Sequence, residues 1–307
     1  TYEEDFKDYI QYFNIFTLSY KRDFGFEFIS YIFYNFGLNV YSVNLFCGFI
    51  FLYSLFALAK ENNNYLITLL IAFPYLILVG AMGYTKQSTA LAFIILCFLS
   101  LKKDFYLRFL IYSVLAILFH KSALIVSLVL LISKFKFDYK SLLILIIISS
   151  LSFFILIMDK SRIASYFIAS YQSEGVYIRL FVNLIAGGIF ILYSSRLDMD
   201  SFEKKFISIS IVLTFIGLFF ASNYSTVIDR FLLYFSIIQL LIYPKFIHIN
   251  NRFSIKLFLP TISFYLLILV VWLSFSNYSL KWTPYKNVLF PGWGYEENQR
   301  FLSVVVD

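Results

Sequence analysis

Three short polar stretches interrupt the apolar segments of this chain and hold the residues best suited to chemistry. They cover residues 84–88, 119–123 and 223–230. In the second stretch, His120 and Lys121 stand side by side within a run that is otherwise almost entirely Leu, Ile, Val, Phe and Ala. Titratable side chains are costly in hydrocarbon, and those found there usually serve function. We therefore expect His120 to face a polar cavity.

The charged residues of these stretches suit an anionic substrate. Arg230 can bind a phosphate through two parallel hydrogen bonds, and Lys86, at the start of a predicted helix, opposes the helix dipole unless an anion is near. Asp229 and His120 are candidate bases, and Arg179 is a further candidate cation. Structural explanations stay open: Lys86 could reach the membrane interface, and His120 could bond a backbone carbonyl. Asp229 and Arg230 could equally form an ion pair that joins two helices.

The composition indicates a polytopic membrane protein. The 307 residues are 61% hydrophobic and 14% charged, and the mean hydropathy is +0.80. Soluble domains contain roughly 25% charged residues. The net charge of +7 is spread over short linkers, without the basic tract that a nucleic-acid-binding protein would need. The sequence has no phosphate-binding loop, no dinucleotide or hydrolase motif and no paired Cys and His spacing, so we expect no cofactor and no metal.

Hydropathy predicts an all-α fold: one polytopic domain over 1–307 with about ten visible transmembrane helices. Residues 1–40 are polar except near 25–36, where a short apolar stretch predicts an interfacial or re-entrant helix. The bundle covers 41–275, and a polar, aromatic-rich tail covers 276–307. We expect one further membrane helix before the first residue. The predicted spans are 41–59, 65–83, 87–101, 105–118, 119–133, 141–158, 177–194, 205–222, 226–243 and 255–275.

Basic residues occur in alternate linkers, which predicts the topology. Twelve of the 25 Lys and Arg lie on one side of the alternation, which we assign to the cytoplasm: Lys60; Lys102 and Lys103; Lys134, Lys136 and Lys140; Arg196, Lys204 and Lys205; and Lys245, Arg252 and Lys256. The three polar stretches, the N-terminal region and the tail then face outward. The spans beside Lys86 and His120 are only about 15 residues long, so both residues should lie below the outer membrane surface in a cavity.

Six short motifs follow one another along nearly the whole chain. They are Asp5-Phe6-Lys7-Asp8-Tyr9 with Phe13; Asp23-Phe24-Gly25-Phe26; Met82-Gly83-Tyr84-Thr85-Lys86-Gln87-Ser88; Phe119-His120-Lys121-Ser122-Ala123; Asp229-Arg230 with Tyr234; and Trp282-Thr283-Pro284-Tyr285-Lys286-Asn287-Val288-Leu289-Phe290. In this order they resemble the EpsG-like branch of the Wzy-type oligosaccharide repeat-unit polymerases, which make bacterial O-antigen and capsule. Lys86 stands where the family usually has Arg, and Asp23-Phe24 replaces Glu-Pro.

The resemblance implies a glycosyltransferase in the bacterial inner membrane with its active site facing the periplasm. A growing glycan would leave undecaprenyl diphosphate and join a hydroxyl of a new lipid-linked repeat unit, without ATP or nucleotide sugar. Cations would bind the diphosphate and a base would activate the hydroxyl. A polysaccharide chain-length regulator is an expected partner. The expected catalytic residues are Asp229, His120 and Asp5; the expected substrate-binding residues are Arg230, Lys86, Arg179, Lys121, Gln87, Tyr84, Tyr234, Trp282 and Tyr285, with the aromatic ones stacking on sugars or lying at the membrane interface.

Other membrane functions stay open. A flippase for lipid-linked oligosaccharide would also hold cations in a cavity, but it should have internal repeats and charges along both halves of a path, which the sequence lacks. An O-antigen ligase would use similar outward His and Arg residues but usually carries a large periplasmic loop. The longest internal outward loop here is about 159–176. A purely structural role would leave the clustering of charge on one side unexplained.

Overall fold

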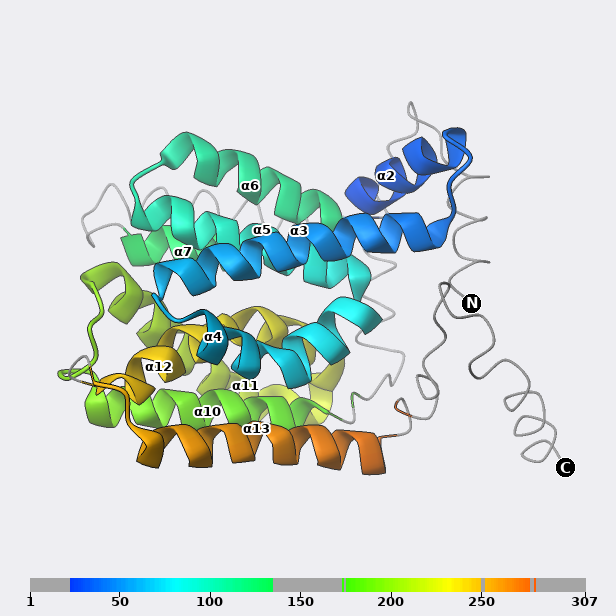
Figure 1. The fold of residues 1–307 in the computed structure, drawn as a ribbon. Helices are drawn as coiled ribbons and strands as arrows, with labels where there is room; N and C mark the ends of the chain where they lie inside the picture. Colours follow the sequence, from blue (N-terminus) through cyan, green and yellow to red (C-terminus); the bar gives the residue numbers. More distant parts are fainter. Residues whose placement is uncertain (1–22, 135–172, 174, 250–251, 277–278, 280–307) are drawn as a thin grey trace, which may run out of the picture. The chain divides into compact units, whose positions relative to one another are not determined.

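The computed structural model describes residues 23–134, 173, 175–249, 252–276 and 279, and these residues form helices without any strand (Figure 1). Contacts divide the chain into two compact units, 1–259 and 260–307, with the boundary inside the last helix. The helices are α2 Phe24–Asn35, α3 Val40–Glu61, α4 Tyr65–Ala72, the π-helix η1 Phe73–Ala81, α5 Thr85–Lys102, α6 Tyr106–Phe119, α7 Ala123–Lys134, α10 Val176–Tyr193, α11 Ser201–Phe235, α12 Ile237–Ile247 and α13 Ile255–Phe275.

Five of the described helices are long and apolar enough to cross a membrane: α3, α5, α10, α11 and α13. Four shorter apolar stretches accompany them: α4 with η1, α6, α7 and α12. The helical fold is therefore confirmed, whereas ten spans remain a prediction, since the span predicted at 141–158 lies outside the described residues. The short helix predicted near 25–36 is present as α2, with 12 residues.

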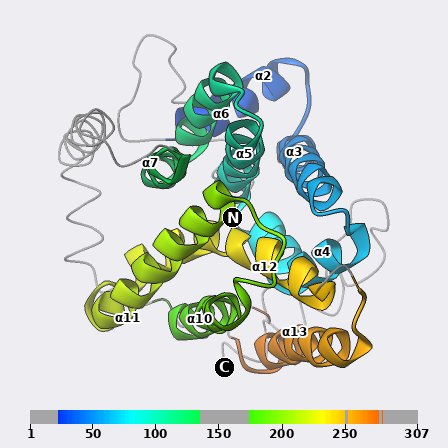
Figure 2. The ribbon, with the colours of Figure 1, turned by 90° about the vertical axis from the view of Figure 1, so that its left-hand side faces the viewer.

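Helix α5 is the centre of the first unit. It packs against α3, η1, α6, α7 and α11, and Figure 2 shows it enclosed by α3, α6 and α7. Three of its hydroxyl side chains donate to carbonyls of the preceding turn: Ser88 to Thr85 at 3.0 Å, Thr89 to Thr85 at 2.8 Å and Ser100 to Leu96 at 2.7 Å. Because these small polar side chains form their hydrogen bonds within α5, neighbouring helices can approach α5 on nearly every side.

Helices α11 and α12 form a hairpin. Asp200 and Glu203 form a reciprocal capping box at the start of α11. The Glu203 carboxylate then lies 2.8 Å from Lys245 near the end of α12, so the chain must reverse between them. Part of this reversal is a kink at Tyr224, whose φ and ψ are −130° and 39°. The turn predicted at 223–229 is thus present as a sharp break at Tyr224 between two helical segments.

Two sequence features explain local distortions in the bundle. Pro74, the second residue of η1, lacks an N–H and its ring crowds the preceding turn, which suits the wider π-helical winding. Gly187 lets α10 approach α11, since a Cβ there would lie 2.9 Å from the Ile211 side chain. The neighbouring Gly188 faces nothing within 4 Å.

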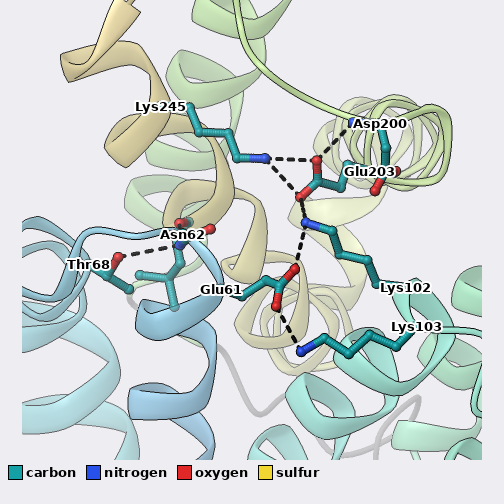
Figure 3. Close-up of polar contacts among 9 residues, drawn as sticks. Glu61, Asn62, Thr68, Lys102, Lys103, Asp200, Glu203 and Lys245 are labelled. Atoms are coloured by element: carbon teal, nitrogen blue, oxygen red, sulfur yellow. Dashed lines mark hydrogen bonds and ion pairs between the residues drawn. The ribbon is translucent and has the colours of Figure 1, made fainter. Parts of the chain in front are cut away.

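The lysine-bearing linkers of the first unit meet at one end of α5, as their alternation predicted. Lys102 contacts Glu61 at 3.2 Å and Glu203 at 3.0 Å, and Lys103 contacts Glu61 at 3.0 Å (Figure 3). Asp104, which follows Lys103 in the sequence, pairs with Lys134 at 2.7 Å, and this hydrogen bond holds the pKa of the Asp104 carboxyl below its ordinary value. The candidate site lies at the opposite end of α5.

Candidate functional site

His120 is held in the turn between α6 and α7. Its backbone is extended and caps α6 through a hydrogen bond from its N–H to the Ala116 carbonyl at 2.9 Å. Its side chain is 9% exposed, and Nδ1 lies 2.5 Å from the Ser122 hydroxyl and 3.3 Å from the Tyr234 hydroxyl. Both hydroxyl oxygens can accept a hydrogen bond from a protonated Nδ1, and in this tautomer the lone pair of Nε2 is available to take a proton.

Tyr234 reaches this site from α11 and is completely buried. Its hydroxyl also lies 3.4 Å from Ser122, so the three side chains form one hydrogen-bonded triangle. A ring with no exposed face cannot stack on a sugar, so this expectation for Tyr234 needs correction. The geometry gives Tyr234 a different task, which is to orient His120.

The first turn of α2 covers the same site. A Cβ on Gly25 would lie 3.0 Å from the Leu118 backbone, so glycine at position 25 lets α2 pack closely against the end of α6. Asp23 lies within electrostatic range of the Tyr234 hydroxyl, and so does Arg230. Glu27, one turn after Asp23, is also buried. Glu27 is not among the predicted site residues, although its spacing from Asp23 places both carboxylates on one face of the helix.

The start of α5 supplies the next two predicted residues. The Lys86 ammonium lies 5.1 Å from the centre of the Phe26 ring of α2, and the side chain is partly exposed. Gln87 is buried, and its amide donates to the Arg230 carbonyl at 2.7 Å. Gln87 therefore ties α5 to α11 at the backbone of Arg230, a positional role beside the substrate-binding one we expected. Arg230 itself is partly exposed.

Asp229 and Arg179 form an ion pair between α11 and α10. The other Asp229 oxygen accepts a hydrogen bond from the Ser173 hydroxyl at 2.9 Å, and the Arg179 guanidinium lies 5.1 Å from the centre of the Tyr75 ring. Both carboxylate oxygens of Asp229 are thus engaged, which leaves His120 better placed to accept a proton. The structural pairing left open for Asp229 is present, but with Arg179 as its partner.

Of the remaining predicted residues, two lie within the described ranges and three lie outside them. Tyr84 caps the start of α5 and is 42% exposed, so its ring is accessible, and Lys121 beside His120 is partly exposed. Asp5, Trp282 and Tyr285 lie outside the described residues. Within the described ranges, no group of three or more His, Cys, Asp and Glu side chains could hold a metal ion.

The site therefore joins residues from α2, α5, the α6–α7 turn and α11, with the Asp229–Arg179 pair beside it. It combines a histidine oriented by hydroxyl groups with partly exposed cations, an arrangement suited to proton transfer next to an anionic group. In comparisons with known proteins, the model of the EpsG family matches residues 1–287. No curated protein and no solved structure matches the chain.

Proposed function

The chain belongs to the EpsG family, and we propose that it is a membrane glycosyltransferase that polymerises undecaprenyl-diphosphate-linked oligosaccharide repeat units at the periplasmic face of the inner membrane. Family membership and the apolar helices support a membrane protein of polysaccharide biosynthesis. The repeat-unit substrate and the outward orientation belong to the proposal.

One observation carries the proposal: His120 and the cations Lys86 and Arg230 meet at one end of α5, opposite the end where the lysine-bearing linkers meet. Gln87 of α5 binds the backbone of Arg230 on α11, and the Tyr234 hydroxyl of α11 faces His120. These contacts connect α5, α11 and the α6–α7 turn at the site. If the lysine-bearing end faces the cytoplasm, as the distribution of basic linkers predicts, the site faces outward. A lipid-linked diphosphate would reach such a site from the outer leaflet.

The proposed reaction follows from these groups. A hydroxyl of the new repeat unit attacks the anomeric carbon of the growing glycan while His120 takes the hydroxyl proton. The bond from that carbon to the diphosphate oxygen breaks, and the electron pair stays on undecaprenyl diphosphate. Arg230 and Lys86, with Lys121 nearby, stabilise the charge that develops on this leaving group. No nucleotide is consumed, because cleavage of the bond between the sugar and the diphosphate of the donor supplies the free energy.

Deletion of the gene in the bacterium that carries it tests the proposal. Loss of a polymerase should leave single capped repeat units on the cell surface, and wild-type protein should restore long chains. Loss of a flippase would remove the surface glycan, and loss of a ligase would leave polymer on the lipid carrier. Either of those outcomes, persistence of long chains, or full complementation by Arg230→Ala and His120→Ala would exclude the proposed activity.

A further inference from the structure

Glu203 is the most deeply buried charged side chain among the described residues, and the proposed reaction does not use it. It is 1% exposed. Its two oxygens lie 2.9 and 2.8 Å from the Lys245 ammonium, and one of them lies 3.0 Å from Lys102 (Figure 3). The same carboxylate accepts the Asp200 N–H at 3.0 Å. A buried carboxylate persists only with such cations and donors around it, because its desolvation is otherwise uncompensated.

The ion pairs of Glu203 join the ends of four helices. Lys102 ends α5, Lys245 lies near the end of α12, and Glu203 itself lies in the first turn of α11. Through Lys102 the cluster extends to Glu61, the last residue of α3. Glu203 therefore closes the base of the α11–α12 hairpin and attaches this base to α5.

The tip of the same hairpin is attached to the other end of α5. There, the Gln87 amide donates to the Arg230 carbonyl at 2.7 Å. The two attachments, at Gln87 and Lys102, are 15 residues apart on α5, or about 22 Å at the α-helical rise. A hairpin fastened to one straight helix at its base and its tip has little freedom to slide or tilt along that helix.

We propose that Glu203 is a positioning residue that sets where Arg230 lies relative to Lys86 and His120. The inference rests on the proposed function for the role of Arg230 at the diphosphate. Without the Glu203 charge, Lys102 and Lys245 face each other as like charges, and the base of the hairpin moves away from α5. The displacement reaches Arg230 through the two helical arms of the hairpin, which run from Glu203 and from Lys245 toward the kink at Tyr224 and are held near the tip by Gln87.

The geometric test measures the distance from the tip of the hairpin to the start of α5. Spin labels at positions 84 and 223, both exposed, report this distance in the full-length protein, while native Cys47 and Cys97 are buried. Glu203→Gln should shift or broaden the distance distribution. Asp198→Asn removes an equal charge from an exposed position in the linker before α11 and should leave the distance distribution unchanged. A Glu203→Gln distribution identical to that of the unsubstituted chain would overturn the inference, whatever the activity of the protein.

The kinetic test separates positioning from loss of folded protein. With purified lipid-linked repeat units, Glu203→Gln should raise KM about tenfold, whereas a smaller folded fraction lowers only the maximal rate. Glu203→Asp keeps the charge on a shorter side chain and should give an intermediate KM, which maintains the test if Glu203→Gln folds poorly. In an Arg230→Lys background, Glu203→Gln should add no further increase, because both changes act through the same contact.

The outcomes of the kinetic test are distinct. If the unsubstituted protein polymerises and Glu203→Gln leaves KM unchanged, the positioning role is wrong while the proposed function stands. Additive effects of Glu203→Gln and Arg230→Lys would also contradict it. If the unsubstituted protein does not polymerise, the proposed function fails and the spin-label distances decide on Glu203 alone.

Discussion

The Tyr234 hydroxyl lies 3.3 Å from Nδ1 of His120, although 114 residues separate the two along the chain. This contact joins α11 to the turn between α6 and α7 at a point where both side chains are buried. A hydroxyl group at one nitrogen of an imidazole selects the tautomer and the ring orientation, which determines what the other nitrogen can do.

Tyr234→Phe should therefore reduce polymerisation about tenfold, corresponding to about 1.4 kcal/mol of lost transition-state stabilisation. The substitution keeps the buried ring and removes only the hydroxyl that orients His120. Rates measured with purified lipid-linked repeat units check this expectation. The matched control is Tyr243→Phe, which removes a buried hydroxyl from α12, in the same hairpin. Equal rates for the Tyr234 and Tyr243 variants would show that orientation of His120 does not limit the reaction.

His120→Ala should lower the rate by about 10²- to 10⁴-fold, the range typical for removal of a general acid or base. The chain has two histidines, and the second serves as the control. His248 lies 2.8 Å from the Asn64 amide in another part of the first unit, so His248→Ala should leave the rate nearly unchanged. Comparable losses in the two variants would mean that His120 acts through folding and not through proton transfer.

The sequence predicted the side of the bundle on which each polar stretch lies better than it predicted the role of each side chain. His120 and Arg230 could be assigned to one end because basic linkers and helix lengths are local properties. The burial of Tyr234 could not be foreseen, since it depends on how α11 packs against a turn more than 100 residues earlier. Glu203 escaped notice for the same reason: its partners Lys102 and Lys245 lie 101 and 42 residues away.

Gly25→Ala should displace α2 from the site and lower activity. The new Cβ would lie 3.0 to 3.1 Å from backbone atoms of Leu118, which cannot move aside as a flexible side chain could, so we expect a cost of about 1–3 kcal/mol. Thermal unfolding of the purified protein and its polymerisation rate both report the effect. Gly48→Ala is the matched control, because nothing lies within 4 Å of a Cβ there, and it should stabilise α3 slightly. Two variants of equal stability would argue against close packing of α2 on α6.

Arg179 and Asp229 offer a test that separates pairing from substrate binding. Each side chain is only about an eighth exposed, at 13% and 12%, so removal of either partner leaves a largely buried, uncompensated charge. Arg179→Met should therefore destabilise the protein by about 3 kcal/mol. The double variant Arg179→Met/Asp229→Asn should recover most of this loss, because no charge remains unpaired.

Activity of the double variant decides what the pair does. If Arg179 only neutralises Asp229, the double variant should regain polymerisation to within about tenfold of the unsubstituted protein, since a pair replaced together leaves no strain on α10 and α11. Arg196→Met, which removes an exposed arginine after α10, controls for the loss of one positive charge in Arg179→Met. A double variant that folds stably but stays as inactive as Arg179→Met would assign one member of the pair to the substrate. In that case Asp229 would again compete with His120 as the base.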